Sequence, residues 1–174
     1  MKQNSLKSLI LILSLFALHC CEDSPPCGQA AVSSISFNYS GTQSGVYFAK
    51  GEVPSSDTTA IYNHQWAMAG LFSDFGEKWI LLQSNLPQGI EIEGIQMHVP
   101  AAGVGKFKLP SDRGLDFIIA TSGSGLDFIS GEIEITYYQC GRVIGTFQGM
   151  LGNPSGTISM AMFQGAFDLK LKNL

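Results

Sequence analysis

Short runs of alternating apolar and polar residues fill the chain from Ser33 to its C-terminus, and turn-forming residues separate the runs. Alternation with a period of two is typical of strands with one buried face, and no long stretch follows the helical period. The clearest runs are 35–39, 46–49, 106–109 and 131–138. The pattern predicts a single all-β domain of about ten strands over residues 33–174.

Local breaks in the pattern predict where strands turn or deform. Ser73 to Glu77 contains Asp and Gly in the arrangement of a hairpin turn, and 153–156 (Asn-Pro-Ser-Gly) reads as another turn. The alternation slips by one residue at Gly94, which predicts a β-bulge. The segment 114–118 (Gly-Leu-Asp-Phe-Ile) recurs as 125–129 and predicts two strand starts. Lys106 and Lys108 suit an edge strand.

Strands with one apolar and one polar face favour an antiparallel β-sandwich, in which two sheets bury one face each. A lipocalin-like up-and-down barrel is the alternative, because consecutive strands with short turns would also close into a ring. The Gly-x-Trp signature expected of a lipocalin is missing, since His64 and Glu77 stand two residues before Trp66 and Trp79. We therefore expect the sandwich.

The N-terminus has the layout of a secretion signal. Lys2 and Lys7 precede an apolar run over 9–18, which His19, Cys20 and Cys21 follow. The run has about ten residues, whereas a membrane-spanning helix needs about 20. It predicts a signal helix that is cleaved on export.

The residues Leu18-His19-Cys20-Cys21 resemble the lipobox of bacterial lipoproteins, although His19 stands where a small or apolar residue is usual. The resemblance implies cleavage before Cys21, a diacylglycerol thioether and an N-acyl chain such as palmitate on that residue, and anchoring in the bacterial outer membrane. Two or more acyl chains hold a protein stably on a membrane. The implied division is a signal over 1–20, a flexible tether over 21–32 and the β domain over 33–174.

Two further features resemble Bacteroidetes lipoproteins. Glu22-Asp23 resembles the acidic export signal that directs such proteins to the cell surface, so the domain is expected to face either the periplasm or the outside. The motifs Gly145-Thr146-Phe147 and Gly165-Ala166-Phe167 resemble the end of small Bacteroidetes lipoproteins of unknown function, in which such a strand pair closes a β domain. Thr58, within Asp57-Thr58-Thr59, matches the short O-glycosylation pattern of these bacteria.

Cysteine parity agrees with this division. Cleavage before Cys21 removes Cys20 and lipidation uses Cys21, which leaves Cys27 and Cys140 as a possible disulfide in an oxidising envelope. The alternative is that one of the two is buried and the other idle in the tether. The cysteines and the histidines of the mature chain lack the spacing of a zinc site.

The mature part is acidic. It carries 8 Lys and Arg against 14 Asp and Glu, a net charge of −6, because two of the ten cations leave with the signal. Without a basic cluster, it is a poor candidate for binding nucleic acid. Attachment to a membrane then depends on the lipid.

Catalytic motifs are missing: we find no nucleophile elbow, zinc-protease motif, P-loop or dinucleotide fingerprint. The pairs Glu91/Glu93 and Glu132/Glu134 have the residue type of a glycosidase pair, but a spacing of two places each pair on one strand face. Asp74 and Glu77 lack the spacing of a calcium loop. We expect neither an enzyme nor a cofactor or metal.

The expected function is non-enzymatic binding of a protein or glycan partner in the envelope or at the surface. Aromatic residues on a sheet face or loop are the natural contacts. The alternative is a carrier of a small apolar ligand in a lipocalin-like cavity, and a third possibility is an accessory subunit of an outer-membrane assembly. The candidate binding residues are Tyr62, His64, Trp66, Trp79, Tyr137 and Tyr138.

Overall fold

The structure, a computed structural model, describes residues 32–54, 63–74, 76–87, 92–109, 117–121, 125–153, 156 and 159–173. These residues form ten strands, and the all-β prediction is confirmed. In chain order they are β1 (Ser34–Gly41), β2 (Gly45–Lys50), β3 (Trp66–Asp74), β4 (Glu77–Asn85), β5 (Ile92–Pro100), β6 (Gly105–Leu109), β7 (Phe117–Thr121), β8 (Gly125–Gln139), β9 (Arg142–Gly152) and β10 (Ser159–Asn173).

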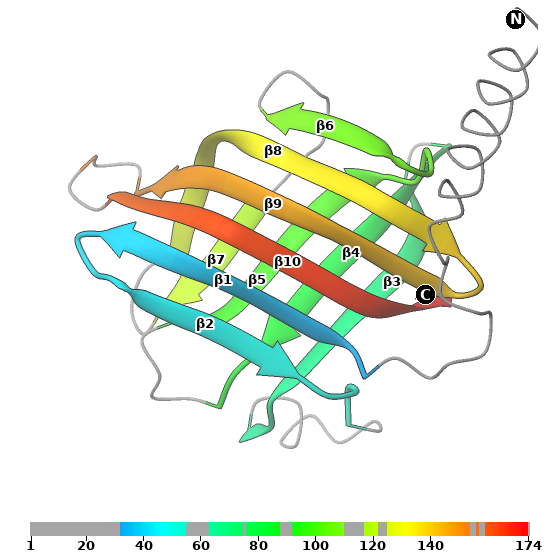
Figure 1. Cartoon of the computed structure of the whole chain (residues 1–174), viewed down its shortest axis with the longest axis horizontal. Coiled ribbons are helices and arrows are strands. Elements are labelled where there is room, and N and C mark those ends of the chain that lie inside the picture. Colours follow the sequence, from blue (N-terminus) through cyan, green and yellow to red (C-terminus); the bar gives the residue numbers. More distant parts are fainter. Residues whose placement is uncertain are drawn as a thin grey trace, which may run out of the picture.

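The strands lie in two facing layers (Figure 1). The front layer contains β2, β1, β10, β9, β6 and most of β8, and the strands β3, β4, β5 and β7 cross behind it. The long strand β8 begins beside β7 in the rear layer and continues beside β9 in the front layer. Its register with β9 shifts between Phe128 and Ser130, and such a bulge lets a strand bend from one layer into the other.

Hydrogen bonding joins both layers into one sheet. Pairing runs from β10 through β3, β4, β5, β7, β8 and β9 and returns to β10, while β1, β2 and β6 extend the front layer. The sandwich of two separate sheets is therefore not confirmed. The seven strands of this ring follow one another in chain order, with β6 left out, and each pairs antiparallel with the next, which is the order of the up-and-down alternative. The ring closes where β10 runs parallel to β3 over residues 171–173.

One core fills the space between the layers, and alternation explains which residues enter it. On β1 the inward side chains are Ile35, Phe37 and Tyr39, and the residues between them are half-buried. Rings from β1, β2, β9 and β10 pack there: Phe37 stacks on Tyr47 at 4.7 Å and meets Phe147 edge-on at 5.7 Å, measured between ring centroids. Isoleucine, leucine, methionine and valine from the rear layer complete the core.

One buried hydrogen bond links the two layers across this core. The hydroxyl groups of Tyr47 on β2 and Ser84 on β4 lie 2.9 Å apart. Burial raises the pKa of Tyr47 to about 12, although the hydrogen bond to Ser84 acts in the opposite direction. A buried hydroxyl group needs a hydrogen-bond partner, and each of these two hydroxyl groups provides that partner for the other.

Several local predictions are confirmed. Asp74 pairs with Glu77 across the β3–β4 hairpin, and the β5–β7 register shifts between Ile92 and Gly94, where the bulge was expected. The amide of Gly156 donates to the carbonyl of Asn153 in the predicted turn. Within the part of the chain that the structure describes, β6 pairs only with β8, as an edge strand does.

The two copies of the Gly-Leu-Asp-Phe-Ile repeat lie at strand starts, as expected. Strand β7 begins within the first copy, β8 begins at the second, and the two strands pair with each other. Asp116 lies outside the described residues. So do the signal over 1–20, the lipidation site Cys21 and all of the tether except Val32. In the described ranges, we find no helix with the length and hydropathy that crossing a membrane requires.

Candidate functional site

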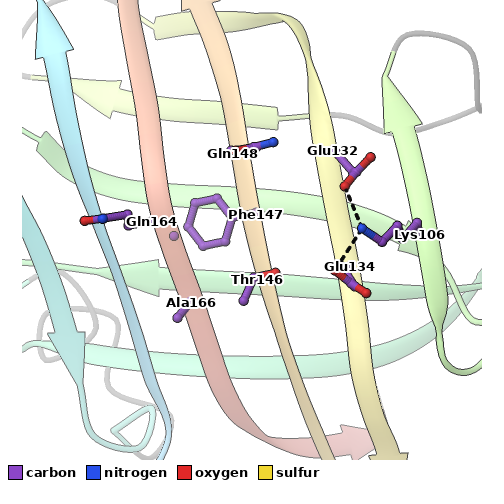
Figure 2. A pocket seen from close by; sticks show the side chains of 9 residues that line it. Lys106, Glu132, Glu134, Thr146, Phe147, Gln148, Gln164 and Ala166 are labelled. Atoms are coloured by element: carbon purple, nitrogen blue, oxygen red, sulfur yellow. Dashed lines mark hydrogen bonds and ion pairs between the residues drawn. The ribbon is translucent and has the colours of Figure 1, made fainter.

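A polar hollow opens on the outer face of the front layer, with a volume of about 350 Å³. Side chains from four neighbouring strands surround it (Figure 2). This volume lies at the lower end of the range for small-molecule sites. The lining residues are Lys106 of β6, Glu132 and Glu134 of β8, Thr146, Phe147 and Gln148 of β9, and Gln164, Gly165 and Ala166 of β10.

The hollow exists because small residues lie at its centre and long ones at its rim. Thr146 pairs with Ala166, and Gly165 pairs with Phe147, so two neighbouring positions on β10 carry almost no side chain. A bulge in β10 accompanies them, and Gln164 there adopts a φ of +53°. The two Gly-x-Phe motifs thus build the floor of the hollow.

The amide side chain of Gln164 is held at the rim. Asn38 on β1 donates from Nδ2 to Oε1 of Gln164 over 2.6 Å. On the other side, Gln148 pairs with Glu132 in the β8–β9 ladder. Amides from two strands therefore border the hollow and offer both hydrogen-bond donors and acceptors.

Lys106 bridges the two carboxylates of the rim. Its Nζ lies 3.3 Å from Oε1 of Glu132 and 3.2 Å from Oε2 of Glu134. Hydrogen bonds to Glu134 and then to Glu132 raise the pKa of Lys106. Its side chain is 57% exposed, so water screens these ion pairs and they add little stability.

The placement of the carboxylates agrees with the expectation for a spacing of two. Both lie on the outer face of β8, on the same side of any ligand, whereas a glycosidase pair flanks the scissile bond. With Lys106 between them, they serve as hydrogen-bond acceptors at the edge of an open hollow. The arrangement suits binding of a polar group rather than acid and base catalysis.

Three of the aromatic candidates lie away from the hollow. Trp79 lies in the rear layer, opposite Phe72 and Pro100. Trp66 is only 4% exposed, so it does not offer the accessible aromatic surface that the sequence suggested. Tyr138 is half-buried against the core.

The remaining binding candidates do not gather in one place either. Tyr137 is half-buried and pairs with Ile144. His64 is exposed, and its carbonyl accepts a hydrogen bond from Nδ2 of Asn85 over 3.1 Å. Tyr62 and the possible glycosylation site Thr58 lie outside the described residues.

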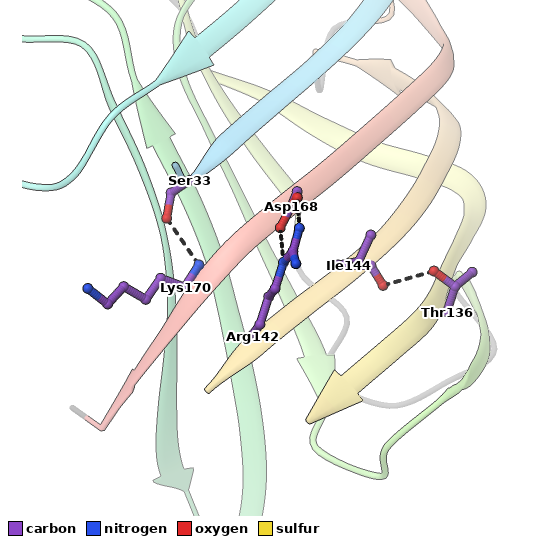
Figure 3. A network of polar contacts seen from close by, with 6 residues as sticks. All are labelled: Ser33, Thr136, Arg142, Ile144, Asp168 and Lys170. Carbon is purple, nitrogen blue, oxygen red and sulfur yellow. Dashed lines mark hydrogen bonds and ion pairs between the residues drawn. The ribbon is translucent and has the colours of Figure 1, made fainter. Parts of the chain in front are cut away.

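A second polar cluster fastens β9 to β10 beside the hollow (Figure 3). Arg142 donates from Nε to Oδ1 of Asp168 over 2.6 Å, and its Nη2 also contacts Oδ2. The bidentate pair raises the pKa of Arg142, mainly through the hydrogen bonds to Asp168. Nearby, the amide of Lys170 donates to Oγ of Ser33, which fixes the start of β1 against β10. This cluster is structural.

Cys140 forms a disulfide bond. It lies with Gly141 in the two-residue turn between β8 and β9, where both residues have a positive φ, +54° and +69°. The other cysteines all lie outside the described residues, so the pairing with Cys27 stays a prediction. Among the residues that the structure describes, no cluster of three or more potential metal ligands occurs.

The structure brings Gln148, Gln164 and Thr146 together, and the sequence singled out only Thr146, as the middle residue of a Gly-x-Phe motif and not as a site residue. Their one signal is that they are uncharged polar residues beside Phe147, Phe163 and the two Gly-x-Phe motifs. Comparison with protein-family models, with curated proteins and with solved structures finds no match for this chain. The function therefore has to be argued from the site.

Proposed function

We propose that this protein is an outer-membrane lipoprotein, held by lipid on Cys21, whose β domain binds a protein or glycan partner without catalysing a reaction. The partner lies in the cell envelope or at the cell surface. The observation that carries the proposal is the position of the hollow: it opens on the outside of the front layer, while core side chains occupy the space between the layers.

The chemistry of the rim indicates what the partner presents there. Amides, a hydroxyl, two carboxylates and an ammonium group surround the hollow, and their formal charges sum to −1. Such a rim matches hydroxyl and amide groups, which both donate and accept hydrogen bonds. A sugar unit or a polar peptide segment has these groups, and an apolar ligand lacks them.

The carrier alternative has weaker support. The packed rings of Phe37, Tyr47 and Phe147 fill the region where the layers face each other. A lipocalin-like ligand would have to displace these rings, and closely packed cores resist such a change. A ligand can enter the hollow on the outer face of the front layer without displacing any core side chain.

Binding at the hollow is tested with the mature protein, purified from membranes in detergent and immobilised. Glycans and proteins released from the envelope are passed over wild type and over the double variant Gln148→Ala/Gln164→Ala. We expect retention of a partner by wild type and at least about tenfold weaker retention by the variant, since each lost hydrogen bond to a ligand costs about 1 kcal/mol. Gln43→Ala is the matched control, because it removes the same kind of side chain from the exposed β1–β2 turn, which does not line the hollow.

Intact mass of the same preparation tests the anchor. A chain that begins at Cys21 and carries about three acyl chains is expected. An unacylated chain would refute the lipoprotein proposal, and equal retention by wild type and the double variant would refute the hollow as the binding site.

A further inference from the structure

The outer face of the rear layer is a second surface with a different chemistry, and strand register defines it. Seven residues each of β3 (66–72), β4 (79–85) and β5 (94–100) lie side by side. Ala67, Ser84 and Ile95 face the core, so the alternate positions face outward. We call these outward positions the rear face, of which Trp66 and Gly70 are themselves buried; they are Trp66, Met68, Gly70, Phe72, Trp79, Leu81, Gln83, Asn85, Gly94, Gln96, His98 and Pro100.

The rear face carries no Asp, Glu, Lys or Arg at any of its twelve positions. The front layer differs sharply, because its outer face carries Lys106, Glu132, Glu134, Arg142 and Asp168. Solvent-facing sheet surfaces are usually polar, and a surface depleted of charge and rich in aromatic residues and methionine is typical of a binding face. The lack of charge on the rear face favours an uncharged binding partner there.

One row across the rear face is made of rings, and another holds two neighbouring glutamines. Phe72, Trp79 and Pro100 form one row, since Trp79 pairs with each of the other two. Further along the strands, Gln83 and Gln96 lie directly beside each other. The face thus offers flat rings at one end and paired donors and acceptors in the middle.

His98 connects the two rows. Its ring centroid lies 5.5 Å from that of Phe72, and its Nε2 lies 3.1 Å from Nε2 of Gln96. One side chain therefore fixes both the aromatic end and one of the central amides. Side chains held in this way lose little conformational freedom when a ligand binds.

We propose that the rear face binds an uncharged glycan chain, with sugar rings stacked on the row of Trp79 and hydroxyl groups bonded to Gln83 and Gln96. The apolar side of a pyranose ring matches an aromatic ring, and its hydroxyl groups match the two functions of an amide. Charged polysaccharides and nucleic acid would find no counter-charge here.

Size and shape favour a glycan over a protein, including a second copy of this chain. Three strands and seven residues span roughly 300 Å² by strand spacing and rise, whereas a standard protein interface buries about 800 Å² on each partner. No side chain of the rear face is among the exposed large hydrophobic residues of the described chain, so its apolar side chains are half-buried or buried. Protein interfaces instead depend on anchors that enter pockets.

This inference rests on the proposed function as a binding domain and names the ligand class of a different surface. In the test, the mature protein in detergent is titrated calorimetrically with cellohexaose, laminarihexaose, mannohexaose and xylohexaose, and with a hexamer of galacturonic acid as the charged comparison. We expect at least one neutral oligosaccharide to bind and the charged one not to bind.

Variants then assign the binding to the rear face. Trp79→Ala should weaken it about tenfold, which corresponds to the loss of one stacked aromatic contact, while Trp79→Phe should stay within about threefold because a ring remains. Gln43→Ala, in the exposed β1–β2 turn and outside both surfaces, should bind the oligosaccharide as wild type does. Unfolding temperatures show whether each variant is folded.

Three results would overturn the inference: no binding of any neutral oligosaccharide, equal binding by wild type and folded Trp79→Ala, or preference for the charged hexamer. Sedimentation supplies a fourth: a dimer that Trp79→Ala dissociates would show that the rear face is a contact between two copies of this chain. If Gln148→Ala/Gln164→Ala retains the envelope partner as well as wild type does, while the oligosaccharide still binds at the rear face, only the proposed hollow site is refuted.

Discussion

Gly145 on β9 lies directly opposite Phe167 on β10, and the Phe167 ring occupies the space that a side chain on Gly145 would need. The second motif repeats the arrangement in reverse, with Gly165 opposite Phe147. Each glycine thus gives room to the aromatic ring of the other strand. The rings lie in the core with centroids 6.4 Å apart, below the floor of the hollow.

Gly145→Ala should destabilise the fold by about 1–3 kcal/mol, because overpacking forces side chains and backbone to move. The added Cβ would meet the backbone carbonyl of Glu134 as well as the Phe167 ring, so Phe167→Leu should not restore stability. Chemical denaturation measures the change. Gly105→Ala is the control, since its Cβ would meet only Phe107 at 3.8 Å; equal effects of both substitutions would contradict the packing argument.

Stability should fall as the pH rises from about 10 to about 12. The folded state keeps the proton of Tyr47 up to a pKa of about 12, whereas the unfolded chain loses it near the ordinary value of 10.0. Between these values the native state binds more protons than the unfolded state, so the free energy of unfolding decreases by up to about 1.4 kcal/mol per pH unit. Below pH 10 this residue adds no pH dependence.

Urea unfolding at pH 9, 10.5 and 12 measures this effect, and Tyr47→Phe should remove it. At neutral pH that variant should lose about 1 kcal/mol, because Ser84 loses its buried partner. The double variant Tyr47→Phe/Ser84→Ala should recover part of the loss. An unchanged alkaline slope in Tyr47→Phe would show that another group is responsible.

Asp168→Asn should lower stability by about 1–2 kcal/mol, because it removes the charge from a bidentate and partly buried pair with Arg142. The two side chains are 19% and 33% exposed. Arg142→Lys should not preserve the pair, since an ammonium group cannot form the fork. Lys170→Gln, which removes an exposed contact with Glu52 at 50% and 55% exposure, is the control and should change stability by less than about 0.5 kcal/mol.

Peptide mapping without reduction should recover Cys140 joined to Cys27. Cys140→Asn removes the disulfide and keeps the turn, because asparagine tolerates a positive φ. It therefore measures the contribution of the disulfide alone. This variant should lose up to about 5 kcal/mol, the upper guide for a bond that closes a loop of more than 100 residues. Recovery of Cys140 joined to any other cysteine would exclude the predicted pair. Cys140→Val removes the disulfide and also places a β-branched residue at the positive φ. If it loses no more stability than Cys140→Asn, the turn conformation makes no separate contribution.

Strand positions, the hairpin turns and the bulge at Gly94 follow from the sequence, because alternation and turn chemistry are local properties. The parallel contact of β10 with β3 leaves no local signal, since it joins residues about 100 positions apart. For the same reason, the alternation showed that each strand has two faces without showing how the strands close into one curled sheet. The choice between a sandwich and a barrel could not be made from it.

The candidate sites divide in the same way. The sequence by itself determined the pairs Glu132/Glu134 and Gly-x-Phe, and it placed no charge in 66–72, 79–85 or 94–100. Only the tertiary structure decided that Lys106 bridges the carboxylates, that Gln164 borders the hollow and that Trp79 lies between Phe72 and Pro100. Register between strands sets these neighbours, and packing of the whole core fixes register, because a slip of one residue would turn every inward side chain outward.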